Sequence, residues 1–235
     1  MNDDDFDDVN ELYLHYKTKF GATRIIGNVV YPTTFKIEAD VWLDMDDLSQ
    51  EEKDFYLNLT LVKIDFFFKN IMDNSIIFGS INEWAIGVLI KDNEPTTDNI
   101  LVKCPLDPSD DHLAMILQSK MSALSKGHLM FGSVTITSNN SKGLRFTFVG
   151  DGRNSLPLME EWVGERSYFD EPWWCRDDAS TFDIIPFADS NLDEKPDFAF
   201  DLDFLGESLR PVINTSSANI IRPKFKPTVV VDNDK

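Results

Sequence analysis

In residues 35–43 every second side chain is apolar, and Lys36, Glu38 and Asp40 lie between the apolar positions. Because successive side chains of a strand point to opposite faces, this alternation predicts a strand with one buried and one solvated face. A sheet of that kind is normally antiparallel and covered on one side only. An earlier run, residues 23–31, ends at Pro32, and we expect the two runs to pair as a hairpin that turns at Pro32 and Thr33.

Two segments carry helix signals. Residues 49–73 open with a capping box, in which Ser49 and Glu52 have the required spacing. An apolar stripe then predicts the inner face of this helix; its members are Phe55, Leu59, Val62 and Phe66. The second helix follows Pro108 and Ser109 and ends near Gly127. Its predicted buried stripe consists of Leu113, Ile116, Leu117, Met121 and Leu124.

Further strands are expected between and after these helices. Residues 76–104 contain three apolar runs, IIFGSI, EWAIGVLIK and NILVKC, which we interpret as two or three strands. Residues 128–150 resemble a hairpin around the polar run at 139–143. For residues 11–150 the sequence therefore predicts an α+β fold, a mostly antiparallel sheet with two packed helices.

The chain changes character at Gly150, after which prolines recur and no long periodic segment remains. Residues 160–207 hold fifteen Asp or Glu, three basic residues and ten aromatic rings. We therefore divide the chain into an acidic leader (1–10), a core domain (11–150), an irregular acidic and aromatic segment (151–208) and a basic, proline-containing extended tail (209–235). The irregular segment is expected either to wrap over the core domain or to be ordered by a partner.

The formal charge of −19 is concentrated in one part of the chain. Residues 150–208 sum to −12, with sixteen acidic and four basic residues, whereas residues 209–235 sum to +3, with two acidic and five basic residues. Such a field repels phosphate backbones, so direct nucleic-acid binding is not expected. It attracts basic surfaces, and an alternative interpretation is that the acidity only maintains solubility.

The two cysteines, Cys104 and Cys175, lie far apart and form no CxxC pair, so we expect neither a zinc site nor a disulfide. The first residues are acidic and lack the features of a signal peptide. No run of apolar residues is long enough to span a membrane. These observations predict an intracellular, cytoplasmic protein without a membrane partner.

No motif selects a reaction. His112 follows Asp110 and Asp111, but these aspartates are explained by the start of a helix, and a metal site needs more ligands. His15 and His128 are interpreted as a strand residue and a helix-end residue. No nucleophile elbow, phosphate loop or EF-hand spacing is present, so no cofactor, metal or catalytic residue is predicted.

The leading hypothesis is a non-enzymatic, acidic protein-binding module, an inhibitor or immunity-type neutraliser that covers the basic, nucleic-acid-binding surface of a partner protein. One alternative is a structural subunit of a viral or cellular assembly that contacts other copies of itself through its C-terminal arm. A second alternative is a carboxylate–metal hydrolase. The predicted partner-binding residues are Asp170, Glu171, Trp173, Trp174, Asp177, Asp178, Asp183, Asp201 and Asp203. For Trp173 and Trp174 themselves, packing within the molecule is the slightly favoured interpretation.

Overall fold

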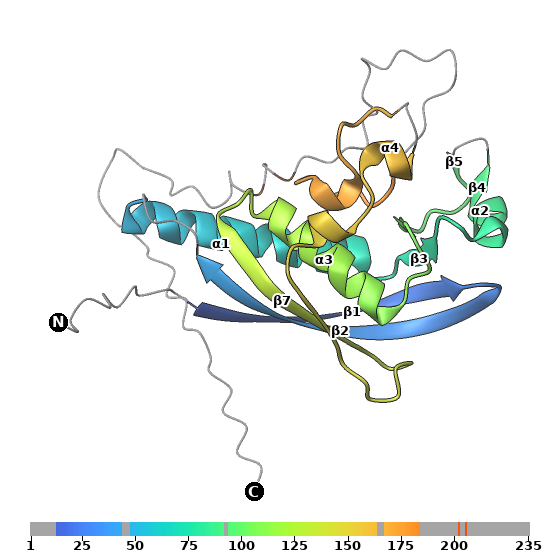
Figure 1. Cartoon of the computed structure of the whole chain (residues 1–235), viewed down its shortest axis with the longest axis horizontal. Helices are drawn as coiled ribbons and strands as arrows, with labels where there is room; N and C mark the ends of the chain where they lie inside the picture. The colour runs from blue at the N-terminus through green and yellow to red at the C-terminus, as the bar shows by residue number, and fades with distance from the viewer. Residues whose placement is uncertain are drawn as a thin grey trace, which may run out of the picture.

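The computed structural model describes residues 13–43, 48–91, 94–163 and 167–183, together with Leu202 and Leu205. Its centre is a six-stranded mixed sheet of order β6-β3-β1-β2-β7-β8. The labelled helices all lie on one side of this sheet (Figure 1). The strands are β1 (Tyr13–Ile26), β2 (Val29–Leu43), β3 (Ile76–Gly79), β6 (Leu101–Cys104), β7 (Leu129–Ser138) and β8 (Phe146–Val149). The predicted α+β class is confirmed, with two parallel pairings, β1 with β3 and β3 with β6, added to the antiparallel ones.

β1 and β2 form a long antiparallel hairpin, as predicted, but its turn lies elsewhere. The chain reverses at Gly27, whose φ of 55° suits glycine, and Pro32 lies inside β2 opposite Thr23. The missing N–H of Pro32 faces away from β1, and the pairing of β2 with β7 begins only at Phe35. No ladder hydrogen bond is lost there, which is why the strand tolerates proline at that position.

α1 (Gln50–Phe66) begins at the predicted capping box, with Ser49 and Glu52 bonded reciprocally, and continues as the π-helical turn η1 (Phe67–Met72). The predicted stripe is wrong for this helix. Thr60, Lys63 and Ile64 are its buried residues, whereas Phe55, Leu59, Val62 and Phe66 are only partly buried. Phe67 and Phe68 of η1 are fully buried against the sheet, and they fix the rotation of the helix.

The run EWAIGVLIK is a helix rather than the expected strand. α2 (Glu83–Leu89) starts at Asn82, whose side chain accepts a hydrogen bond from Ala85 N. Only Ala85 and Leu89, four residues apart, are buried in it. Its end leads into a short ribbon of β4 (Ile90–Lys91) and β5 (Glu94–Pro95).

α3 (Asp110–Leu124) confirms the second predicted helix, and its five stripe residues are buried. It packs over β7 and β8, which form the predicted hairpin. The chain then continues through a 3₁₀ turn η2 (Gly152–Ser155), a short helix α4 (Met159–Trp162) and a second 3₁₀ turn η3 (Trp173–Cys175). In the described residues, no helix is long and apolar enough to cross a membrane.

Candidate functional site

Trp173 and Trp174 lie inside the molecule. Both have no exposed surface, and they belong to the main hydrophobic core together with Leu202. Trp173 Nε1 donates to the backbone oxygen of Lys103 on β6 at 2.9 Å, and its ring meets that of Trp174 edge to face. The two tryptophans therefore attach the segment 167–183 to the core domain, and neither can serve as an anchor on a surface.

A buried cation, Lys120, holds this segment from the side of α3. Its Nζ donates to the backbone oxygens of Trp173, Arg176 and Asp178 at 2.8, 2.8 and 2.6 Å. The Asp178 carboxylate lies 3.7 Å away and is the nearest counter-charge. Burial lowers the pKa of the Lys120 ammonium to about 8, although Asp178 opposes this shift.

The sequence position of Lys120 is itself a signal of its burial. Position 120 is four residues after Ile116 and seven after Leu113, so it lies in the middle of the predicted apolar stripe of α3. A lysine at such a position needs buried acceptors. The three backbone oxygens that meet this need come from an irregular turn, which no periodic pattern reveals.

Asp183 is a second internal charge, 2% exposed. Its Oδ2 accepts from Trp162 Nε1 at 2.9 Å and from Trp173 N at 3.0 Å, and its Oδ1 binds Arg176. Arg176 also binds Asp178 at 3.0 Å. The carboxylates of Asp178 and Asp183 are therefore used within the molecule, which contradicts their prediction as parts of a docking surface.

The other predicted partner-binding residues are placed differently. Asp170 and Glu171 are exposed, and Asp177 is partly exposed and paired with Lys126 at 2.8 Å. Asp201 and Asp203 lie outside the described residues. Among the seven members of this set that the structure describes, no continuous acidic and aromatic face is formed.

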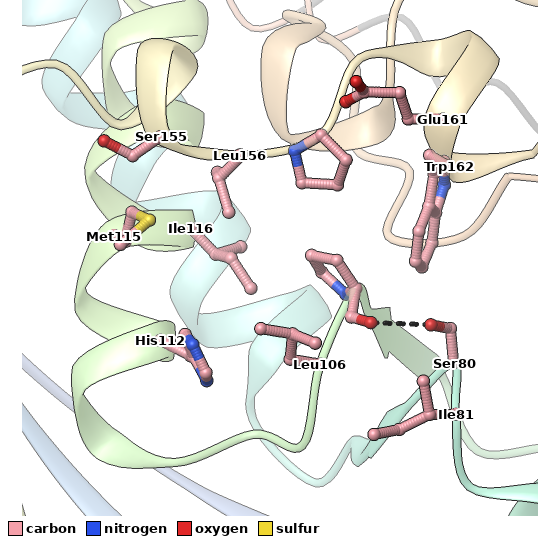
Figure 2. Close-up of a pocket in the computed structure, with 12 residues that line it drawn as sticks. Ser80, Ile81, Leu106, His112, Met115, Ile116, Ser155, Leu156, Glu161 and Trp162 are labelled. Atoms are coloured by element: carbon pink, nitrogen blue, oxygen red, sulfur yellow. Dashed lines mark hydrogen bonds between the residues drawn. The ribbon is translucent and has the colours of Figure 1, made fainter.

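A cavity of about 410 Å³ lies beside residues 167–183, between α3, α4 and two loops (Figure 2). Its walls are mainly apolar and come from four separate parts of the chain. The lining residues are Ser80, Ile81, Pro105, Leu106, His112, Met115, Ile116, Ser155, Leu156, Pro157, Glu161 and Trp162. Both the size and the apolar lining are those of sites that hold small molecules.

Two glycines allow the loops of this cavity to lie so close to their neighbours. A Cβ on Gly79 would come within 2.8 Å of Leu106 O, and a Cβ on Gly152 within 2.5 Å of Met115 O. Gly152 N also donates to Gln118 Oε1 at 2.7 Å. The close approach fixes the positions of Leu106 on one rim and Leu156 on the other.

Trp162 forms one wall of the cavity and is held in place on its other sides. Its Nε1 is bound by Asp183, its ring meets the Trp174 ring edge to face at 5.0 Å, and Lys103 Nζ lies 5.0 Å from the ring centre. Burial lowers the pKa of Lys103, and Asp183 opposes this shift. Trp162 is thus held by three contacts that do not involve the cavity, and a side chain positioned in advance lowers the cost of binding.

His112 contributes a polar group to the lining. Its Nδ1 lies 3.0 Å from Ser109 Oγ and 3.2 Å from Asp107 O. Because a carbonyl oxygen only accepts, the contact with Asp107 favours a proton on Nδ1, and in the neutral ring Nε2 is then the acceptor. Glu161 is occupied differently, since its Oε2 accepts from Leu158 N at the start of α4.

The described residues contain no group of three or more His, Cys, Asp or Glu side chains that could hold a metal ion. The apolar walls of the cavity are suited to contacts with a mainly apolar molecule, and His112 and Glu161 are the ionisable groups in its lining.

No protein-family model and no curated protein matches the chain. Among solved structures it is similar to the crystal structure of 6-pyruvoyl tetrahydropterin synthase from Plasmodium vivax. The two chains are 11% identical, the match covers 60% of this chain and 98% of the synthase, and the TM-score is 0.36. A likeness at this level carries no argument about activity.

The hypothesis of an acidic inhibitor is wrong. Trp173, Trp174 and Asp183 are at most 2% exposed, so the proposed anchors and part of the proposed charge are internal. The alternative of an assembly arm concerns the tail 209–235, which lies outside the described residues and is not tested. The alternative of a carboxylate–metal hydrolase gains no support from the residues that the structure describes.

Proposed function

We propose that the chain binds a small, uncharged and mainly apolar molecule in the cavity between α3 and α4. The observation that supports this most is the cavity itself, about 410 Å³ in volume and lined by apolar side chains from four segments. A ligand of one or two rings fits a space of this size. His112 Nε2 supplies a hydrogen-bond acceptor, so a ligand with one hydroxyl or N–H group is favoured over a pure hydrocarbon.

Binding of 2-naphthol tests this proposal. The molecule has two apolar rings and one hydroxyl donor, and at about 0.5 kcal/mol per heavy atom it should bind with a Kd on the order of 0.1 mM. Protein NMR with increasing 2-naphthol should show saturable chemical-shift changes for the Trp162 indole and for Leu106. Naphthalene, which lacks the donor, should bind more weakly.

A matched pair of variants locates the site. Ile81 lines the cavity and is 64% exposed, so Ile81→Trp should fill the entrance without disturbing the core. Val88 on α2 is 53% exposed and is not a lining residue, so Val88→Trp adds the same ring elsewhere. We expect Ile81→Trp alone to abolish the shifts. Shifts that are absent from the wild type, or that survive in Ile81→Trp, contradict the proposal.

We also propose an intracellular location. Cys104 is buried and Cys175 is partly buried, and both are free thiols, which suits a reducing compartment. Fractionation of the native host followed by thiol labelling of the unfolded protein would check this, because oxidised cysteines would argue against it.

A further inference from the structure

Among the described residues, no strand pairs with the outer edge of the N-terminal half of β1, which we call the open edge. β3 pairs with β1 only at residues 23–25. The loop before β3, residues 73–75, forms hydrogen bonds with Gly21 and Thr23 of β1. Thr23 N donates to Ser75 O at 2.8 Å, Gly21 N donates to Asp73 Oδ1 at 2.8 Å, and Gly21 O accepts from Asn74 N at 2.6 Å.

The hydrogen-bonding groups of this edge follow from the alternation of the strand. Since Gly21 and Thr23 direct their backbone groups away from β2, His15, Lys17 and Lys19 do the same. In the part of the chain that the structure describes, these three residues have no backbone partner on that side. Such an edge is a template for one more strand.

The outward side chains along the edge are basic. His15, Lys17 and Lys19 are exposed, and Lys36 of β2 lies directly opposite Lys19. Glu38, which lies opposite Lys17, is bound by Arg145 at 2.7 Å. His15 Nδ1 lies 2.9 Å from Asp40 Oδ1, whereas within the described residues no carboxylate pairs with Lys17 or Lys19. A basic row in a chain with a charge of −19 favours an acidic strand as its occupant.

The same charges argue against a second β1 edge as the occupant. Antiparallel pairing of two such edges about Lys17 would place Lys17 against its own copy and His15 against Lys19. Like charges directly opposite each other destabilise a sheet.

Residues 3–9 of the chain, DDDFDDV, have the complementary pattern. Residues 3–9 can be paired antiparallel with β1 in the register in which the numbers of two opposite residues sum to 22. In this register Asp3 lies opposite Lys19 and Asp5 lies opposite Lys17. Asp7 then lies opposite His15. Residues 10–12 are left as a three-residue loop, a common length for a hairpin.

The inner face agrees with the same register. Phe6 lies opposite Tyr16, which is 9% exposed and faces the core. A shift by one residue would turn Phe6 to the outer face and would leave at most two aspartates, Asp4 and Asp8, opposite the basic row. The register that sums to 22 is favoured because it places three aspartates there and turns Phe6 inward, although it also turns Asp4 and Asp8 to the inner face.

We infer that the open edge of β1 is a strand-addition site and that residues 3–9 of the same chain occupy it, with Asp3, Asp5 and Asp7 opposite Lys19, Lys17 and His15. This inference does not depend on the ligand cavity, which lies on the helix-covered side of the molecule.

Disulfide trapping in the full chain tests the register. Asp4→Cys and Thr18→Cys form a directly opposite, non-hydrogen-bonded pair, whose Cα atoms lie about 4.5 Å apart, within reach of a disulfide. Asp8→Cys with Thr18→Cys is the control, because four residues along a strand separate the partners by about 13 Å. Both pairs are made with Cys175→Ser, since Cys175 is the partly buried thiol and Cys104 is fully buried.

Under mild oxidation at low protein concentration, we expect the first pair to form an intramolecular disulfide in most molecules and the control pair to form little. Equal yields, no disulfide in either, or a disulfide-linked dimer in place of the monomer would overturn the inference. The last outcome would assign the edge to a second copy.

A charge swap tests the pairing of Asp5 with Lys17, again by the yield of the disulfide between positions 4 and 18. Asp5→Lys should lower the yield of the 4–18 disulfide several-fold, and Lys17→Asp added to Asp5→Lys should restore it. All of these positions lie at the edge or outside the core, so the variants should fold. The pairing of Asp5 with Lys17 would be contradicted if Asp5→Lys left the disulfide yield unchanged. It would also be contradicted if adding Lys17→Asp did not restore the yield.

Discussion

Lys120 is the residue on which the C-terminal part of the described structure depends most. It has no exposed surface, and it bonds three backbone oxygens from residues 173–178. Phe67 and Trp173 also present their rings to it, at 5.4 and 5.8 Å. An ammonium group in such surroundings costs desolvation energy, and the hydrogen bonds offset that cost only while the turn keeps its shape.

Replacing Lys120 by Met should therefore destabilise the protein by about 3 kcal/mol, because three buried oxygens lose their donor and Asp178 loses one of its two cations. Lys126→Met is the matched control. Lys126 pairs with Asp177 at 2.8 Å, but both side chains are nearly half exposed, so the loss should stay below about 1 kcal/mol. Urea unfolding followed by tryptophan fluorescence measures both; similar losses would refute the assigned role of Lys120.

The lowered pKa of Lys120 predicts a pH dependence. Its pKa is about 8 in the folded protein against an ordinary value of 10.5, so between these values the unfolded chain binds more protons than the folded one. The unfolding free energy should then rise with pH through this window, by at most about 1.4 kcal/mol per pH unit, and the contribution should be constant below pH 7. Burial raises the pKa of Cys104 and of Tyr16, which acts in the opposite direction at high pH.

The measurement is therefore a difference between the wild type and Lys120→Met at each pH from 7 to 9.5, in which the contributions of Cys104 and Tyr16 cancel. We expect the stability advantage of the wild type to increase with pH. A difference that is flat, or that falls, would mean that Lys120 keeps its ordinary pKa.

At the scale of elements, the sequence predicted those segments whose signals are local and redundant. The capping box at Ser49 and Glu52 and the five-residue apolar stripe of α3 were confirmed. A capping box or an apolar stripe of that length has few alternative explanations. α2 was mistaken for a strand, since a seven-residue run of Trp, Ile, Val and Leu fits both periods and only the cap at Asn82 decides between them. The cavity could not be predicted, because its walls meet through contacts of loops that have no periodicity.

The loop at Gly152 packs so closely against α3 that only a residue without a Cβ atom fits there. Gly152→Ala should cost about 2 kcal/mol, since the new methyl group would lie 2.5 Å from Met115 O, a backbone atom that cannot move aside easily. Gly87→Ala in α2 is the opposite case, where the added methyl group meets nothing within 4 Å, and it should stabilise the helix by about 0.5–1 kcal/mol. Thermal unfolding of the two variants should shift Tm in opposite directions; a harmless Gly152→Ala would show that the loop is not tightly packed.

At the scale of the whole molecule, residues 167–183 are joined to the core domain through two buried charges, Lys120 and Asp183. The sequence showed that the rings and acids alternate, but it could not show which acids are internal, because burial of Asp183 depends on donors from Trp162, Trp173 and Arg176. The first of these donors belongs to the wall of the cavity. Asp183 thus connects the ligand site with the segment that covers α3.

Asp183→Asn keeps the shape of the side chain but removes the charge that Arg176 faces. We expect a loss of about 3 kcal/mol in unfolding free energy, with fluorescence and far-UV circular dichroism transitions that still coincide if the segment and the sheet unfold together. Binding of 2-naphthol should weaken several-fold because the Trp162 wall loses its fixed position.

Asp170→Asn changes an exposed carboxylate of the same segment and should change neither the unfolding free energy nor the binding of 2-naphthol measurably. Separate transitions would show that residues 167–183 unfold independently of the sheet, and unchanged binding with lowered stability would show that the wall does not depend on Asp183.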